Sequence, residues 1–377
     1  MNELRPLRVC VIDNLPDFHA LADSWRTILA TSEAHSPFLT WEWLYHWTLQ
    51  YLGKDRLWIL LLVDSDSTHR LRGIAPFCVR QTGCRPLGTS REVAFLGGHG
   101  VGSTYLDVIA GRGDKPSVLA SLCDYLLGHA AREWDIITLA QLPAESLTLD
   151  LLQARFDAAG KVAVMVDHTC CPTLDLPPTV DAYRHSLRPS LRRTLQRKRQ
   201  ALEQQGTVTY RRTQSGDDIS TALETFSSLH QKRWAPRSCQ GGAFRDSRFR
   251  AFHAEITRLF HAQHWLDFSF LCLDGRPLAG VYGYRHEHTY YYYLPGFDPE
   301  RSAKASPGML LLSHRIEQAI EDGCRRFDLL QGPAGYKMTW AQRSSRCLSL
   351  RLYNRTWRAA AWHCVESLKQ GAKILLR

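Results

Sequence analysis

The sequence predicts two α/β domains in tandem, each with a mixed, mostly antiparallel sheet flanked by helices. The chain has 377 residues, 44% hydrophobic and 22% charged, which is a globular composition with enough apolar residues for two cores. Strand-like apolar runs alternate with segments of helical periodicity. Because the order of these segments in the first half recurs in the second half, the pattern also indicates a structural repeat.

The second half shows this order more clearly. Two strands at 267–273 and 277–285 are separated by the turn signal Asp274-Gly275, and a strand rich in tyrosine follows. A loop and a helix come next, and the apolar strand RFDLLQG at 326–332 completes the set. The order predicts a meander of three strands followed by a β–α–β crossover.

The first half repeats the order with less regular segments. Its predicted elements are strands at 58–64, 72–80, 92–98 and 103–109, a helix at 117–129 and a strand at 134–142. Helical segments precede each set, at 15–30 with 40–52 and at 220–234 with 248–263. Proline and polar residues interrupt the pattern at 169–178. We therefore expect domains at 1–175 and 176–356, followed by a basic amphipathic C-terminal helix at 357–377.

The composition of the chain indicates its cellular compartment and argues against disulfide bonds and a metal site. No apolar run approaches the length of a membrane span, and the N-terminus lacks the apolar segment of a signal peptide. Eleven cysteines without a CxxC pair indicate reduced thiols rather than a disulfide framework. The histidines have no third ligand at a recognisable spacing, so no metal site is expected. We expect a cytoplasmic protein.

The net charge of +10 is concentrated in one segment. Between Arg184 and Arg212 there are nine Lys or Arg residues against one Glu. An amphipathic basic helix is predicted over 187–202, with these leucines along one face: Leu187, Leu191, Leu195 and Leu202. Two interpretations stay open: a solvated surface helix, or one that binds an anionic substrate, a membrane surface or RNA.

The segment at 289–323 predicts an anion site. After the tyrosine strand, Ser306 is placed to cap a helix whose first residue is Pro307, and Gly323 is placed to end it. A helix start presents backbone N–H groups and the positive end of the helix dipole. Gly308 lacks the Cβ that would hold a ligand away from those amides. An ordinary strand–loop–helix connection is the alternative.

Several phrases together resemble a known family. They are PFLTWEWLYHW (37–47), STYLDV (103–108), LRRTLQRKRQALEQQG (191–206), YYYLPGFDPERSAKASPGMLLL (291–312) and FDLLQGPAGYKMTW (327–340). Over most of residues 5–355 the chain resembles the GNAT acyltransferases and the related Fem-type peptidyltransferases, in particular the cellulose-biosynthesis (CelD-type) branch of GNAT proteins. The resemblance implies two tandem GNAT-like domains.

The resemblance also implies a donor, acetyl-CoA or another acyl-CoA, as co-substrate. In GNAT enzymes its pyrophosphate binds where the fourth strand leads into a helix, and the matching residues here are Lys304, Ser306, Pro307, Gly308 and Met309. The family signature, Arg/Gln-x-x-Gly-x-Gly/Ala, is not intact, because Lys304 stands near the basic position and Pro307-Gly308 replace its second half. We expect the donor site in the second domain only.

N-acyl transfer requires an amine to lose a proton and a thiolate to gain one. Asp328 is the lone carboxylate in an apolar strand beside the donor loop, so it is a candidate for taking the amine proton; an ion pair with Lys337 is the alternative. Tyr336 is a candidate for protonating the thiolate, against simple packing beside Trp340. Lys337 is a candidate for binding an acidic acceptor or the cofactor.

Substrate-binding candidates lie in both halves. Tyr105 and Asp107 stand at the end of the first-half strand that corresponds to the donor-loop strand. Arg233 and Trp234 end a helix and are candidates for contacting a sugar or a phosphate, and Gln331 is assigned to the same group.

The resemblance implies an acyl-CoA-dependent N-acyltransferase that acts on an amino sugar or related precursor of an exopolysaccharide or surface glycan. One alternative is Fem-type transfer from aminoacyl-tRNA, with the basic helix on RNA, although no long helical hairpin is present. Another is a non-catalytic scaffold of a membrane polysaccharide synthase, with the tail at 357–377 resting on the inner membrane. The expected partner is a small-molecule or glycan-precursor amine; nucleic acid belongs to the Fem-type alternative alone.

Overall fold

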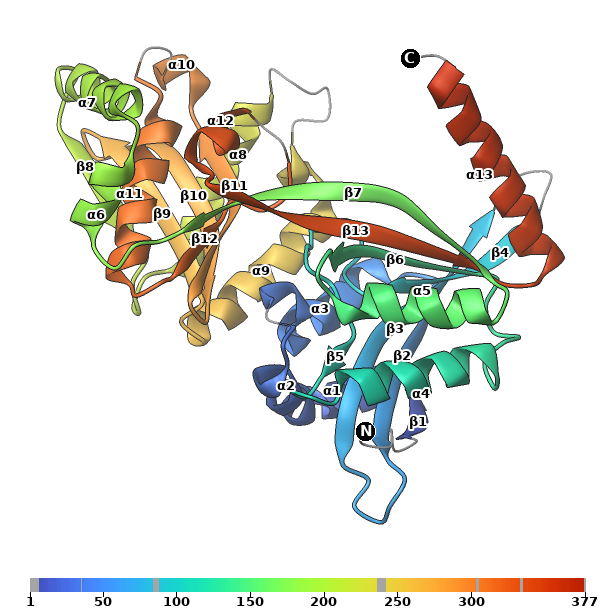
Figure 1. Ribbon diagram of the computed structural model, residues 1–377. Coiled ribbons are helices and arrows are strands. Elements are labelled where there is room, and N and C mark those ends of the chain that lie inside the picture. The colour runs from blue at the N-terminus through green and yellow to red at the C-terminus, as the bar shows by residue number, and fades with distance from the viewer. Residues whose placement is uncertain are drawn as a thin grey trace. The chain divides into compact units, whose positions relative to one another are not determined.

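The computed structural model describes residues 7–34, 36–83, 88–235, 242–302, 305–332 and 335–375 (Figure 1). The chain divides into two compact units, Met1–Thr169 with Arg346–Arg377, and Cys170–Ser345. It passes between the units within β7 (Val162–Asp175) and again within β13 (Arg343–Tyr353). Residues 346–356, which the sequence assigns to the second domain, thus contribute to the first unit.

The first unit contains a sheet in the order β1-β2-β3-β4-β6-β13. Its elements before β7 are β1 (Leu7–Ile12), α1 (Leu15–Ala20), α2 (Ala22–Thr31), α3 (Trp41–Tyr51), β2 (Arg56–Asp64), β3 (Leu71–Gly83), β4 (Thr89–Phe95), β5 (Ile109–Ala110), α4 (Lys115–Leu127), β6 (Ile136–Pro143) and α5 (Leu147–Ala158). Neighbours in this order are antiparallel except β4 and β6, which are parallel.

The second unit contains a sheet in the order β7-β12-β11-β10-β9-β8. Its elements between β7 and β13 are α6 (Val180–Ser186), α7 (Pro189–Glu203), β8 (Val208–Arg212), α8 (Ile219–Trp234), α9 (Ser247–Ala262), β9 (Leu266–Leu273), β10 (Arg276–His286), β11 (Thr289–Phe297), α10 (Pro299–Ser302), α11 (Pro307–Glu321), β12 (Arg326–Asp328) and α12 (Gly335–Trp340). Here the parallel neighbours are β11 and β12.

The two units share one plan. In each, a meander of antiparallel strands leads through a crossover helix into a parallel neighbour, with α4 joining β4 to β6 and α11 joining β11 to β12. Among the described strands each sheet is mixed and mostly antiparallel, and helices flank it (Figure 1). The predicted fold class, two tandem α/β domains that each have a mixed, mostly antiparallel sheet flanked by helices, is confirmed.

The tyrosines of β11 supply both faces of the second sheet. Successive side chains in a strand point to opposite faces. Tyr290 and Tyr292 belong to the apolar core that also contains Leu311 and Ile316 of α11. Tyr293 instead hydrogen-bonds His253 of α9 through its hydroxyl. The tyrosine run is therefore a strand buried on both sides, between α11 on one face and α9 on the other.

Three parts of the sequence prediction were wrong in detail. The strand predicted at 103–109 is irregular chain up to the short β5. The strand predicted at 326–332 ends at Asp328, because Asp328 Oδ1 accepts a hydrogen bond from the Leu330 amide and Leu330 takes a left-handed φ of 55°. The long strands β7 and β13, and β1, were not predicted. Their pairing partners are remote in sequence, and no hairpin turn marks them.

The C-terminal helix α13 (Trp357–Leu375) begins against the first unit. Ala359 is fully buried in a cluster with Ile136 and Tyr353, and Glu366 forms an ion pair with Arg351. These contacts favour a docked terminal helix for its first turns. Over the residues that the structure describes, no helix has the length and apolarity needed to cross a membrane.

Candidate active site

The start of α11 is built by a residue in an unusual conformation. Ser306 precedes the helix with φ 48° and ψ 60°, the left-handed region, and its side chain makes no capping hydrogen bond to the helix. The Ser306 carbonyl accepts from the Met309 amide at 2.9 Å, which closes the first turn. Pro307 at the first position has no N–H to satisfy. The helix thus begins without the side-chain cap that normally covers its first amides.

A cavity of about 390 Å³ opens at this helix start. It is lined mainly by aromatic and proline side chains, together with the first residues of α11 and one guanidinium: Arg233, Tyr292, Pro295, Phe297, Pro299, Ser306, Pro307, Gly308, Met309, Tyr336 and Trp340. Its volume lies within the range of about 300–1,000 Å³ that ligand pockets occupy. An apolar wall beside a helix N-terminus and a cation suits a ligand with an apolar arm and an anionic group.

Arg233 is the cation of this cavity. Its guanidinium lies over three aromatic rings, 5.4 Å from the centroid of Trp234, 5.3 Å from Phe297 and 6.0 Å from Tyr336. Arg233 donates one hydrogen bond to the Pro295 carbonyl at 3.1 Å, while its buried Nε has no hydrogen-bond partner among the described residues. A buried donor without a partner is costly, so an anionic ligand oxygen would relieve this cost.

Tyr336 reaches the cavity from α12. It shares a side-chain hydrogen bond with Tyr292, whose pKa is raised well above its usual value, chiefly by burial. Trp340, one turn further along α12, is buried and also lines the cavity. The side chain of Tyr336 therefore packs in the core beside Trp340 and also forms part of the cavity wall.

Asp328 and Lys337 are both buried, and neither is among the described residues that line this cavity. Asp328 is buried at the end of β12, where Oδ1 accepts from the Leu330 amide at 2.7 Å. Lys337 is buried too, and its Nζ donates to the carbonyls of Gln331 at 2.8 Å and Leu330 at 3.3 Å. Burial is the main cause that lowers the pKa of Lys337 to about 8, although nearby Asp328 acts in the opposite direction.

Some of the predicted site residues line the cavity and others do not. The structure brings six of them into the lining of one cavity: Arg233, Ser306, Pro307, Gly308, Met309 and Tyr336. Trp234 supports Arg233 through its ring, and Gln331 contributes its carbonyl to Lys337. Lys304 lies outside the described residues.

Tyr105 and Asp107 belong to the first unit. Tyr105 takes a left-handed φ of 56°. Asp107 is buried, accepts hydrogen bonds from the hydroxyls of Ser146 and Thr148, and forms an ion pair with Lys115 at 2.9 Å. Within that unit the Asp107 carboxylate therefore ties α4 to the start of α5.

The sequence interpretation missed a contact between the basic helix and the donor loop. Lys198 of α7 donates a hydrogen bond from Nζ to Ser306 Oγ at 2.6 Å. The helix predicted at 187–202 is found as α7, Pro189–Glu203, with Leu191 and Leu202 buried and Leu195 partly buried. Leu187 was wrongly placed on this helix, because it precedes α7 in extended backbone. The helical charge pattern signals a basic surface. A contact between residues 108 positions apart leaves no mark in spacing or periodicity.

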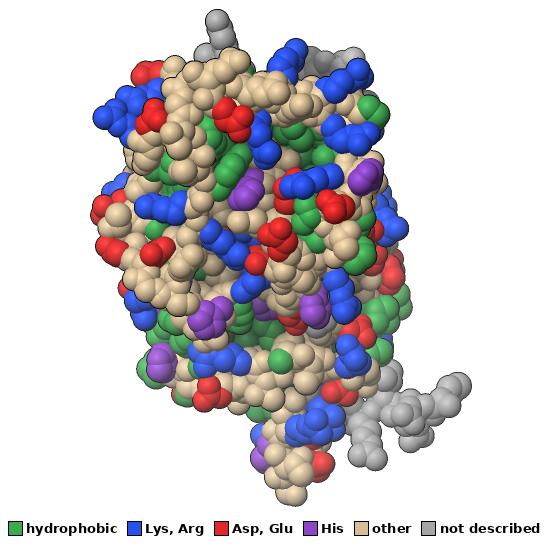
Figure 2. All heavy atoms as spheres, turned by 90° about the vertical axis from the view of Figure 1, so that its left-hand side faces the viewer, with side chains coloured by type: hydrophobic (Ala, Val, Ile, Leu, Met, Phe, Trp, Pro, Cys, Tyr) green, Lys and Arg blue, Asp and Glu red, His purple; other side chains and the backbone are tan. Residues whose placement is uncertain are grey.

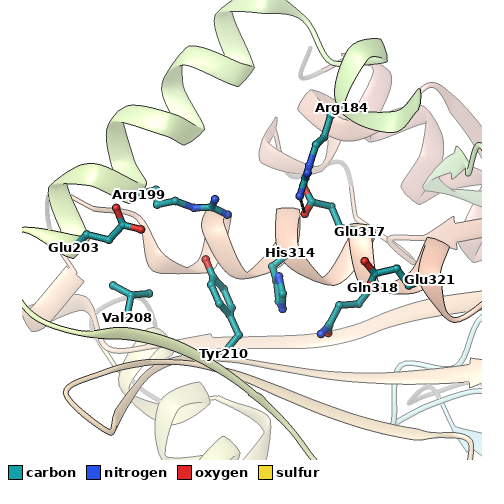
Figure 3. A pocket seen from close by; sticks show the side chains of 9 residues that line it. All are labelled: Arg184, Arg199, Glu203, Val208, Tyr210, His314, Glu317, Gln318 and Glu321. Carbon is teal, nitrogen blue, oxygen red and sulfur yellow. Dashed lines mark hydrogen bonds and ion pairs between the residues drawn. The ribbon is translucent and has the colours of Figure 1, made fainter. Parts of the chain in front are cut away.

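A second pocket lies further along α11, between α7, β8 and α11 (Figure 3). Arg199 and Tyr210 point toward one another there, and Arg184 forms an ion pair with Glu317 at 2.7 Å. The ring of His314 packs against that of Tyr210 with centroids 4.0 Å apart and a tilt of 31°, and burial lowers the pKa of His314 to about 4. At a rise of about 1.5 Å per residue, His314 stands roughly 10 Å along α11 from Pro307. This pocket is therefore separate from the helix start.

The described residues contain no group of three or more His, Cys, Asp or Glu side chains placed to hold a metal ion.

Figure 2 views the molecule from the side on which α7 and β8 lie, and shows Lys and Arg side chains with Asp and Glu side chains between them. This face therefore carries charges of both signs.

A comparison with models of protein families finds a match within the second unit. Residues 189–338 match the model of the acetyltransferase (GNAT) domain family. This range begins at α7 and includes α11 and most of α12. It therefore contains the helix start, the cavity and the basic helix. A comparison with curated protein sequences finds no match.

Solved structures of low sequence identity share the fold over nearly the whole chain. FemX is 10% identical with a TM-score of 0.59, over 87% of this chain and 95% of its own. The C-terminal domain of a putative lysylphosphatidylglycerol synthetase from Agrobacterium fabrum is 11% identical with a TM-score of 0.51, over 94% and 97%. L-PGS from Bacillus licheniformis is 13% identical with a TM-score of 0.52, over 95% and 98%.

Proposed function

We propose that the chain transfers an acyl group from acyl-CoA to the nitrogen of an amine, starting from the match of residues 189–338 to the acetyltransferase (GNAT) domain family. The observation that carries the proposal is the cavity at the uncapped start of α11, with Arg233 in its wall. Helix amides and a guanidinium suit the diphosphate of the donor. The aromatic and proline wall suits its apolar arm and the thioester.

The reaction breaks the thioester C–S bond and forms an amide C–N bond. The amine loses a proton, and the departing thiolate gains one. Tyr336, whose side chain lines the cavity, is the proposed donor of the thiolate proton. Asp328, buried at the end of β12, is the proposed acceptor of the amine proton, directly or through water. Holding both substrates together supplies a further part of the acceleration.

Lys337 has a separate proposed role, which is to bind an acidic acceptor. Its amine uses two of its N–H groups on the carbonyls of Leu330 and Gln331. The ammonium form carries three such groups, which leaves one for an acceptor carboxylate or phosphate. With a pKa of about 8, the amine is charged at neutral pH.

The proposed acceptor is an amino sugar or related precursor of an exopolysaccharide or surface glycan, which is the substrate class implied by the CelD-type phrases. An acyl-CoA donor fits a protein that works in the cytoplasm. A peripheral contact with a membrane or a synthase is a further proposal. For that contact the remaining candidate surface is the exposed side of α13, where Trp357 is 66% exposed.

A second candidate is Fem-type transfer from aminoacyl-tRNA. The shared fold of FemX and the exposed arginines of α7 favour it. Thermal unfolding of the purified protein separates the two functions, because a ligand that binds only the folded state raises the melting temperature. Protection by acetyl-CoA, and not by bulk tRNA, is expected. Protection by tRNA alone would replace the acyl-CoA proposal with the Fem-type one.

A screen of amines then identifies the acceptor. Free thiol released from acetyl-CoA is measured for amino sugars, nucleotide-linked amino sugars and amino acids. Tyr336→Phe serves as the matched variant, since it keeps the ring in the cavity wall and removes the hydroxyl. Turnover should fall in this variant while acetyl-CoA affinity stays.

A further inference from the structure

The side chain of Ser306 is turned away from the helix that it precedes. A serine at this position normally accepts a hydrogen bond from an amide of the first turn. Here Ser306 Oγ makes no such bond and accepts from Lys198 Nζ at 2.6 Å instead. The same contact therefore leaves the first amides of α11 uncapped and brings an ammonium group to them.

The core holds Lys198 at this place. Leu191 and Leu202 of α7 are 7% and 0% exposed, and they belong to the same apolar cluster as Leu310 and Leu311 of α11. Lys198 itself is half-buried, whereas its neighbour Arg197 is exposed. The position of Lys198 is thus fixed by packing of helix on helix, and differs from that of the solvated arginines of α7.

The two cations at this helix start have uncharged partners: Lys198 donates to the Ser306 hydroxyl and Arg233 to the Pro295 carbonyl. In the part of the chain that the structure describes, no carboxylate lies within ion-pair distance of either cation. Buried or half-buried cations usually have an acidic partner. Two positive side chains and the positive end of a helix dipole, together, suit a ligand with more than one negative charge.

From these contacts we propose that Lys198 binds the phosphates of the donor, so that the basic helix α7 supplies part of the acyl-CoA site. Of the three N–H groups of its ammonium, one is held by Ser306 Oγ and the others are available to phosphate oxygens. Lys198 approaches from α7 and Arg233 from α8. The inference rests on the proposed function, and it assigns α7 a binding role that a solvated surface helix does not have.

The test compares two thioesters that differ in their phosphates. Acetyl-CoA carries the diphosphate, and S-acetylpantetheine carries the same acetyl thioester and apolar arm without phosphates. Dissociation constants are measured by calorimetry for the wild type, for Lys198→Met and for the matched control Arg197→Met, the exposed neighbour on the same helix.

Lys198→Met should weaken acetyl-CoA binding by about 10- to 100-fold, the size of a lost charge-assisted hydrogen bond. Its affinity for S-acetylpantetheine should stay within about twofold of the wild type. Arg197→Met should change neither constant beyond that range. Lys198→Arg, which keeps the charge, should recover most of the lost acetyl-CoA affinity. This recovery would show that the loss in Lys198→Met comes from the missing charge and not from misfolding.

Equal acetyl-CoA affinity in Lys198→Met and the wild type would overturn the role of Lys198 and leave the proposed function standing. An equal loss for both thioesters would also overturn it, because the loss would then arise from a distorted cavity. If the wild type binds neither thioester, the proposed function fails together with this inference.

Discussion

Gly308 and Phe297 are neighbours in the lining of the cavity at the start of α11: a Cβ placed on Gly308 would lie 3.6 Å from Cδ1 of Phe297. This distance is ordinary van der Waals contact. A methyl group at Gly308 is therefore tolerated by the protein, yet it occupies space in the proposed donor site.

Gly308→Ala should weaken acetyl-CoA binding by about tenfold or more, a cost typical of overpacking a filled site. The melting temperature should stay equal or rise slightly, because Ala restricts the unfolded chain more than Gly. Gly216→Ala is the control, since a Cβ there meets no atom within 4 Å. Unchanged affinity in Gly308→Ala would place the donor elsewhere.

Arg233→Gln should raise the dissociation constant for acetyl-CoA by about 10- to 100-fold. The reason is that the Arg233 guanidinium lies in the cavity wall, and its Nε has no hydrogen-bond partner in the described part of the chain. Calorimetry with Arg258→Gln as control checks this, because Arg258 is exposed on α9 and pairs with Glu255. Equal losses in the two variants would indicate a general charge effect.

Asp328→Asn should lower turnover by about 10²-fold or more, the usual size of a general-base contribution, and leave acetyl-CoA affinity unchanged. Asparagine keeps an oxygen that can accept from the Leu330 amide, which Asp328 now does at 2.7 Å. The fold at the end of β12 should therefore survive. A variant that melts at lower temperature but retains its turnover would show that Asp328 is structural.

The buried amine of Lys337 should make stability depend on pH. Burial lowers its pKa from 10.5 to about 8. Between these values the folded protein has lost a proton that the unfolded chain retains, so the free energy of unfolding rises with pH. Melting temperatures of the wild type and Lys337→Met are compared across pH 7–10. Above about pH 8, the melting temperature of the wild type should rise relative to that of the variant. A constant difference would contradict the lowered pKa.

Lys337→Ala should also raise the Michaelis constant for an acidic acceptor, because it removes binding present in both the ground state and the transition state. The Michaelis constant for a neutral analogue of the acceptor should stay the same in this variant. An equal rise for both acceptors would contradict the proposed contact between Lys337 and the acidic group.

Binding of α7 to a membrane surface or to RNA can be tested through its exposed arginines. Changing Arg192, Arg193 and Arg197 together to Glu should weaken binding to anionic vesicles or RNA without unfolding the chain, since all three are exposed. Leu202→Ala should instead destabilise the protein by about 2–5 kcal/mol, because Leu202 is fully buried. Unchanged affinity for both anions in the triple variant would make these arginines a solvated face.

Local patterns in the sequence were enough to determine much of the fold. The turn Asp274-Gly275, the tyrosine strand and the helix that starts at Pro307 appear in the structure where the sequence places them. Turn chemistry, alternation and helical periodicity act over a few residues, so they are visible in sequence. The resemblance to GNAT proteins added the donor loop, and six predicted residues line one cavity there.

Only the tertiary structure decided what surrounds that loop. Lys198 meets Ser306 because α7 packs on α11, and Arg233 meets Phe297 because α8 packs on the sheet opposite α11. The strands β7 and β13 pair with partners far away in the chain. Such contacts depend on how elements pack, which no local pattern encodes. The sequence by itself determined the helix start that can hold an anion; packing decided which cations reach it.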